Sequence, residues 1–232
     1  MRIVFWGSER GCGVTSNMLI VATCLACQKG YRIAMMELAE EKQGIESCFS
    51  KIEECHMQEY IGTLIKRQLY YVSTREWERE NGTSIPELIK FLELNMDIVF
   101  VNLANRTDEE AKHLMWNADL VVVNLKQKNA EFDRYYAQYA NLSKKIFLLI
   151  GNYYENEYCN KESLQKKYRI PEGQLAVIPN NPEYQMACER GSLERYIRRM
   201  KSRFVSAIKD QFIKAVGNVA EQIHVAAFTE EE

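Results

Sequence analysis

The residues best suited to chemistry form a glycine-containing loop, Phe5-Trp-Gly-Ser-Glu-Arg-Gly-Cys-Gly-Val-Thr-Ser-Asn17, between an apolar run and a long helical segment. Gly11 and Gly13 let the backbone approach an anion closely. Thr15 and Ser16 place hydroxyls at the start of the helix, where one normally holds magnesium. Backbone N–H groups at the amino end of a helix bind phosphate. The loop therefore indicates a nucleotide-binding architecture, but it lacks the lysine that such a loop uses.

The elements around this loop follow an α/β pattern. Short apolar runs alternate with amphipathic segments, which predicts repeated βαβ units around a parallel sheet. The expected strands are 2–6, 32–37, 69–73, 98–102, 120–125, 146–151 and 175–178, and the expected helices are 15–29, 84–95, 108–117, 129–141 and 161–168. We expect residues 74–83 to be an irregular link with Trp77 as an exposed anchor. The prediction is one three-layer α/β/α domain over 1–232, with a mostly parallel sheet of about seven strands and a C-terminal helical cover at 192–225.

Composition sets the broad class. The chain has 232 residues, 47% of them hydrophobic, and a net charge of -2. This near-neutral balance argues against a nucleic-acid binder that uses its whole surface. No apolar stretch reaches the ~18 residues of a membrane-spanning helix. The odd number of scattered cysteines, seven, indicates reduced thiols of a cytoplasmic protein rather than a disulfide framework. Peripheral attachment to the inner membrane stays open as an alternative location.

A basic stretch begins the C-terminal cover. It contains Arg195, Arg198, Arg199, Lys201 and Arg203 on a segment whose apolar residues recur at helical spacing. The first interpretation is a covering helix with a solvated basic face. The alternative is a docking surface for an acidic protein, an anionic lipid or DNA.

The order of motifs resembles the MinD/ParA family of deviant P-loop ATPases over nearly the whole chain. The family's K-G-G-x-G-K-T-[ST] loop aligns with Glu9-Arg-Gly-Cys-Gly-Val-Thr-Ser16, and its D-x-D motif with Glu37-Leu-Ala39. Its Walker B strand aligns with Met96-Asp-Ile-Val-Phe-Val-Asn102, and its next strand with Ala118-Asp-Leu-Val-Val-Val-Asn124. Asn152 matches the adenine-reading asparagine, and Ile178-Pro-Asn-Asn-Pro matches the family's I-P-x-D segment. The resemblance implies a P-loop NTPase fold.

The departures from the family pattern fall on charged positions. The signature lysine, which reaches phosphates across a dimer interface, falls on Glu9, and the lysine that binds the β- and γ-phosphates falls on Val14. The water-orienting aspartate falls on Ala39, and the magnesium-linked Walker B aspartate on Asn102. Arg10 could substitute for a lysine, and Asn102 could offer an oxygen to a metal-bound water.

The resemblance also implies the site residues. Nucleotide contacts fall on Arg10, Gly11, Cys12, Gly13, Val14, Thr15, Ser16, Asn152 and Pro179, and weak Mg²⁺ contacts on Thr15 and Asn102. No catalytic residue is assigned. One lost lysine weakens binding by about ten- to a hundredfold, so we expect ATP or ADP with Mg²⁺ at reduced affinity and little or no hydrolysis.

Three functional hypotheses follow. The first is a degenerate scaffold that positions or assembles a bacterial complex, such as pilus or secretion machinery, with a protein partner. The second is a slow ATP-dependent dimerisation switch, active in partitioning or localisation. The third is a binder of DNA or a membrane surface through the basic stretch.

Overall fold

The computed structural model describes residues 1–38, 44–50, 52–54, 61–65, 68–82, 84–206 and 210–228. Within them one sheet of nine strands has the order β3-β4-β5-β2-β6-β1-β7-β8-β9. The strands are β1 (Arg2–Gly7), β2 (Ile33–Glu37), β3 (Glu53–Glu54), β4 (Ile61–Ile65), β5 (Leu69–Val72), β6 (Ile98–Asn102), β7 (Leu120–Leu125), β8 (Ile146–Tyr153) and β9 (Leu175–Pro179).

The strand number corrects the expectation of about seven. All seven predicted strands are present, as β1, β2 and β5 to β9, and they pair in parallel. The difference is β3 and β4, which add antiparallel pairs beyond β5. Only Ile61 of β4 is buried, so this strand near the edge lacks the continuous apolar run that marked the central strands.

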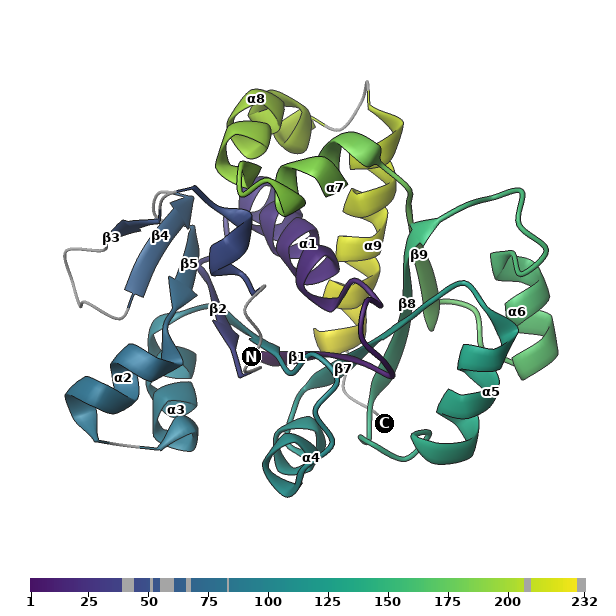
Figure 1. The fold of residues 1–232 in the computed structure, drawn as a ribbon, viewed down its shortest axis with the longest axis horizontal. Helices are drawn as coiled ribbons and strands as arrows, with labels where there is room; N and C mark the ends of the chain where they lie inside the picture. Colours follow the sequence, from purple (N-terminus) through teal and green to yellow (C-terminus); the bar gives the residue numbers. More distant parts are fainter. Residues whose placement is uncertain are drawn as a thin grey trace.

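Helices cover both faces of the sheet, which confirms the three-layer architecture (Figure 1). Alternate strand residues point to opposite faces: Ile3 and Phe5 join one core cluster, while Val4 and Trp6 join the other. The first cluster includes α1 (Val14–Lys29), α7 (Pro182–Glu189), α8 (Leu193–Ser206) and α9 (Gln211–Phe228). The second includes α2 (Thr74–Asn81), α3 (Ile85–Asn95), α4 (Glu109–Trp116), α5 (Asn129–Gln138) and α6 (Lys161–Tyr168).

Two helices were not predicted. The expected irregular link at 74–83 is wrong, because α2 occupies most of it: the Ser73 hydroxyl accepts a hydrogen bond from the Glu76 N–H at 3.4 Å and so caps the helix. Trp77 is only 8% exposed and stacks on Phe91, so it is not an exposed anchor. Helix α7 starts with Pro182 after the capping side chain of Asn181.

The C-terminal helical cover consists of two helices. Helix α9 packs against α1 and β9, and α8 packs against α1 and α7. Leu193, Ile197 and Met200 of α8 are buried, whereas Arg195 and Arg198 are exposed, so its amphipathic pattern places the apolar residues on the core. Among the described residues, no helix combines the length and the apolar content needed to cross a membrane.

Candidate nucleotide-binding site

The glycine loop connects the carboxyl end of β1 to the amino end of α1. Gly11 and Gly13 have φ values of 76° and 80°, a left-handed conformation that side chains disfavour. The first i to i−4 bond of α1 runs from the Asn17 N–H to the Gly13 carbonyl oxygen at 2.8 Å. The N–H groups of Val14, Thr15 and Ser16 therefore precede the helical ladder, so this end of α1 retains the backbone geometry of an anion site.

Buried amides fix the base of the loop. The Asn17 side chain donates to Asn124 Oδ1 at 2.9 Å, and the Asn124 side chain donates to the Trp6 carbonyl oxygen at 3.1 Å. Asn17 is 4% exposed and Asn124 is fully buried. This pair ties α1 to β7 and β1, and it was not singled out from the sequence, although Asn124 ends a run of apolar residues in β7.

A hollow of about 420 Å³ opens at the loop. Its lining includes Arg10, Gly11, Cys12, Gly13, Val14, Thr15 and Ser16, so the structure brings most of the expected nucleotide-contacting residues together. The far side of the hollow is formed by Ser47, Cys48, Cys188 and Glu189. The hollow thus lies between the loop, α7 and η1 (Glu46–Cys48), a 3₁₀ turn that packs against α7.

Asn152 and Pro179 do not line this hollow. Asn152 lies at the carboxyl end of β8 with φ 51°, and its side-chain oxygen accepts a hydrogen bond from Gln185. Pro179 ends β9, in register with Tyr153. Both residues lie at the carboxyl edge of the sheet, but here the Asn152 oxygen is engaged by α7, and their adenine-binding role stays a prediction.

Two cations that bind the start of the loop were not singled out in the sequence analysis. Lys126, directly after β7, lies 2.6 Å from Glu9 Oε1, and Arg134 of α5 lies 2.6 Å from Glu9 Oε2. Lys126 also donates to the Arg10 carbonyl oxygen at 2.9 Å. Hydrogen bonds from Lys126 and then Arg134 lower the pKa of Glu9 to about 2. The sequence could have indicated Lys126 by its position directly after a predicted strand, because the carboxyl ends of parallel strands meet at the edge of the sheet where ligands bind.

A buried carboxylate braces the same loop from α5. Glu131 is 2% exposed; its Oε1 accepts a hydrogen bond from the Ser8 hydroxyl and lies 3.1 Å from Cys12 Sγ. Burial, and then this contact with Glu131, raise the pKa of Cys12 to about 12. Cys12 is therefore a neutral thiol that packs the loop rather than a nucleophile.

The position of the missing phosphate lysine is filled by apolar packing. Val14 is 7% exposed, and its Cγ2 lies so near Gly7 that a Cβ on that glycine would be 2.8 Å away. The side chain thus seals the loop against β1 and supplies no positive charge.

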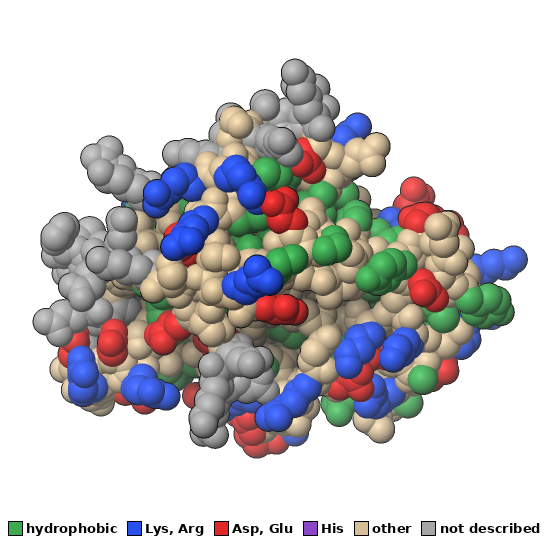
Figure 2. All heavy atoms as spheres, turned by 45° about the horizontal axis from the view of Figure 1, so that its top comes forward, with side chains coloured by type: hydrophobic (Ala, Val, Ile, Leu, Met, Phe, Trp, Pro, Cys, Tyr) green, Lys and Arg blue, Asp and Glu red, His purple; other side chains and the backbone are tan. Residues whose placement is uncertain are grey.

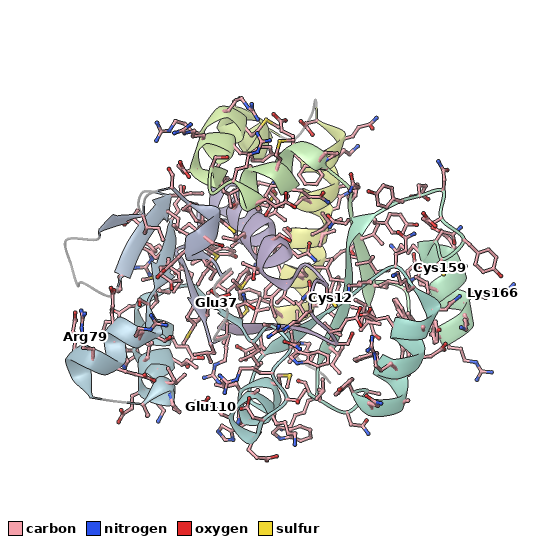
Figure 3. The ribbon with its side chains drawn as sticks, in the orientation of Figure 1. Cys12, Glu37, Arg79, Glu110, Cys159 and Lys166 are labelled. Atoms are coloured by element: carbon pink, nitrogen blue, oxygen red, sulfur yellow. The ribbon has the colours of Figure 1, made fainter. Side chains whose placement is uncertain are left out.

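The residues around Thr15 do not fit a magnesium ion in their present arrangement. Asn102 donates from Nδ2 to Thr15 Oγ1 at 2.9 Å and to Glu37 Oε1 at 2.8 Å, while its Oδ1 accepts from the Ala104 N–H at 2.9 Å. Asn102 therefore presents N–H groups toward Thr15, where the resemblance implied an oxygen ligand, and Mg²⁺ prefers oxygen. Figure 3 labels Glu37 and Cys12 on opposite sides of the amino end of α1.

Two further expectations fall on residues that are described only in part or not at all. Ala39, the position of the second family aspartate, lies outside the described residues. On α8, the Arg199 guanidinium pairs with Glu183, and Arg195 lies 3.9 Å from Glu194, whereas the side chains of Lys201 and Arg203 are not described. Figure 2 shows blue basic side chains gathered over this part of the molecule.

No family model matches the chain, and no curated protein matches it. Solved structures do match over almost its whole length. A ParA family ATPase from Chlorobium tepidum is 10% identical, with a TM-score of 0.69, covering 95% of this chain and 98% of that one. MinD from Pyrococcus horikoshii, complexed with Mg-ADP, is 14% identical, with a TM-score of 0.67 and 98% coverage of both chains. The MinC:MinD complex of Aquifex aeolicus gives 13%, a TM-score of 0.67, and coverage of 100% and 98%.

Fold and loop together define the class: a P-loop architecture with a mostly parallel sheet and a glycine loop at the amino end of α1. Within that class, the chain has the fold of the MinD and ParA ATPases, as the resemblance in the sequence implied. At these identities the likeness concerns the fold.

Proposed function

We propose that this protein is a degenerate MinD/ParA-like scaffold that binds nucleotide weakly, hydrolyses it little or not at all, and positions or assembles a protein complex. The observation that carries the proposal is the neutralisation of the loop: Lys126 and Arg134, the cations that reach it from β7 and α5, are both bound to Glu9. The backbone cradle is retained, but these side-chain charges are already paired within the protein.

Nucleotide binding and nucleotide hydrolysis respond differently to the loss of positive charge at the phosphate site. The helix amino end and the N–H groups of the loop still attract a phosphate. One missing charge-assisted hydrogen bond costs about 1.5–3 kcal/mol, which leaves affinity in the range of roughly high micromolar to millimolar. Cations that act on phosphoryl transfer contribute about 10³–10⁵ in rate. The loss therefore removes turnover before it removes binding.

Calorimetric titration with ATP and Mg²⁺, and with ADP for comparison, tests the binding half. We expect weak heats with the unchanged protein and none with Gly13→Asp, which places a carboxylate at the amino end of α1. Gly30→Asp is the matched control, because Gly30 lies at the other end of the same helix with φ 74° and no atom within 4 Å of an added Cβ. Equal heats from both variants would show that ATP binds elsewhere.

Phosphate release at saturating Mg-ATP tests the catalytic half. We expect no release above that of the Gly13→Asp variant. Sustained turnover that Gly13→Asp abolishes would refute the degenerate assignment and favour the slow ATP-dependent switch. In that case, Arg10→Ala should lower both affinity and ATP-dependent dimerisation measured by light scattering.

The scaffold role rests on the fold and on analogy with the MinC:MinD complex, in which a protein of this fold assembles with another protein. Pilus or secretion machinery is the class of assembly that we propose. A cytoplasmic location, with peripheral contact at the inner membrane, accords with this role.

A second candidate function has its own observation, the exposed arginines of α8. Arg195, Arg198 and Arg199 are exposed, while neighbouring apolar residues of the same helix are buried. Such a face suits anionic lipid or DNA. Co-sedimentation with anionic vesicles and gel shift with duplex DNA, each at low and high salt, should respond to reversal of Arg198 and Arg199 to Glu. Binding that is indifferent to this reversal excludes the α8 face.

A further inference from the structure

Two cysteines that are far apart in the sequence line the same side of the loop hollow. Cys48 ends η1 and Cys188 lies on α7, and both contribute to the lining opposite the glycine loop. Each thiol is the largest influence on the pKa of the other: Cys188 lowers the pKa of Cys48, and Cys48 raises the pKa of Cys188. The Cys48 thiol itself donates to the Gly44 carbonyl oxygen at 3.7 Å.

The segments that carry these thiols are held together by other contacts. The Ser50 hydroxyl donates to Glu194 Oε1 at 2.6 Å, which joins residues 44–50 to α8. A Cβ on Gly191 would lie 3.0 Å from the Ser47 carbonyl oxygen, so the turn after α7 passes directly against η1. Both cysteines therefore lie where two segments already pack together, and a covalent link there requires little loss of backbone freedom.

The same contact leads to the loop. The Tyr184 hydroxyl, one turn before Cys188 on α7, donates to the Ser16 carbonyl oxygen at 2.6 Å. On the other side, the Ile45 N–H donates to Glu37 Oε2 at 2.9 Å, and Glu37 accepts from Asn102 beside Thr15. Thus α7 contacts the start of α1 directly, and the residue before η1 connects to the same region through Glu37 and Asn102.

We propose that Cys48 and Cys188 form a reversible disulfide that ties η1 to α7 in the far wall of the loop hollow, with a low-molecular-weight disulfide such as oxidised glutathione as the oxidant. The Cys48 thiolate attacks one glutathione sulfur, breaks the S–S bond and releases one glutathione thiolate. The Cys188 thiolate then attacks the Cys48 sulfur and releases the second. Two protein thiols are oxidised, one glutathione disulfide is reduced, and the two protons end on the two glutathione thiols.

Cys12 and Cys24 are less suited to this reaction. Cys24 is fully buried within α1, and its pKa is raised by burial. Cys12 lines the hollow, but its thiol is directed to Glu131. We therefore expect oxidation to select the Cys48–Cys188 pair.

Peptide mapping of the folded full-length protein tests this pairing without any nucleotide. The protein is incubated with oxidised glutathione, free thiols are blocked, and a non-reducing tryptic digest is examined by mass spectrometry. Trypsin places Cys48 in peptide 43–51 and Cys188 in peptide 170–190, whereas Cys12, Cys24 and Cys27 share peptide 11–29. We expect peptide 43–51 to be linked to peptide 170–190, with a mass lower by two hydrogens than the sum of the two. Dithiothreitol should separate the two peptides. The linked peptide should be absent when the protein is oxidised in urea, where the fold no longer pairs the two cysteines.

Variants separate the two steps of the reaction. Cys188→Ser should trap glutathione on Cys48, and Cys159→Ser, which alters a cysteine outside the hollow, should leave the linked peptide unchanged. Recovery of both thiols in their blocked form, or links from either peptide to 11–29 instead, would overturn the proposal.

The effect of the link on nucleotide rests on the proposed function. If reduced protein binds ATP, the oxidised protein should exchange it more slowly by about tenfold or more, because the far wall of the hollow can no longer move away from the loop. An equal exchange rate would overturn this part. Absence of ATP binding in the reduced protein would instead count against the proposed function, and the mapping result would still decide the disulfide.

Discussion

Glu9→Gln removes the carboxylate that holds Lys126 and Arg134 at the loop. The pKa of Glu9 lies at about 2, against 4.5 for a free side chain. The full shift corresponds to about 3 kcal/mol of stability. Because the side chain is 32% exposed, solvent screening reduces the expected contribution to about 1–2 kcal/mol.

The sign of the pH dependence follows from the lowered pKa. The folded state favours ionised Glu9, so its contribution is complete above pH 4.5 and is lost as the pH falls toward 2. Urea unfolding of the unchanged protein and of Glu9→Gln should therefore differ most at pH 7 and converge as the pH approaches 2. Glu109→Gln is the matched control, because the Glu109 side chain is 91% exposed in its pair with Lys112, and it should change stability by less than about 0.5 kcal/mol.

The same variant tests the neutralisation of the loop. Freed from Glu9, one of the two cations can turn to a phosphate, which should raise the affinity for ATP by about ten- to a hundredfold. Titration calorimetry measures this directly. An unchanged affinity in Glu9→Gln, with the expected loss of stability, would refute the reasoning that paired cations are what weakens the site.

Two further predictions concern buried polar groups near the loop. Asn102→Asp places a second carboxylate beside Glu37 at a fully buried position; like charges raise the pKa of such a pair, so stability should fall by about 3 kcal/mol as the pH rises from about 5 to 8. The stability of Asn102→Ala should not fall in this way between about pH 5 and 8. A stability of Asn102→Asp that does not change with pH would contradict the placement of residue 102 beside Glu37. Tyr184→Phe breaks the bond to Ser16 and should cost about 1–3 kcal/mol in urea unfolding. Tyr196→Phe is its control, because the buried Tyr196 hydroxyl has no hydrogen-bond partner among the described residues; equal losses would mean that the hydroxyl bond contributes nothing.

The central strands were the most predictable part of the fold. Ile98–Asn102 and Leu120–Leu125 were predicted to the residue, because strands buried on both faces require uninterrupted apolar runs. Strand β4 has mostly half-buried residues, and β3 spans only Glu53–Glu54, so neither produces such a run. Helix α2 was missed because Thr74–Asn81 is almost entirely polar, and only Trp77 anchors it in the core.

The sequence by itself determined the fold class, the position of the loop, and the absence of a lysine from it. It also placed Gly11 and Gly13 where the backbone turns into α1, because their conformational requirement is local. Only the tertiary structure decided how the charges pair, since Lys126 and Arg134 meet Glu9 from two different elements. It also decided that Cys48 and Cys188 line the same side of the hollow. Partners more than a hundred residues apart leave no periodic signal in a single sequence, because they are brought together by the packing of strands and helices.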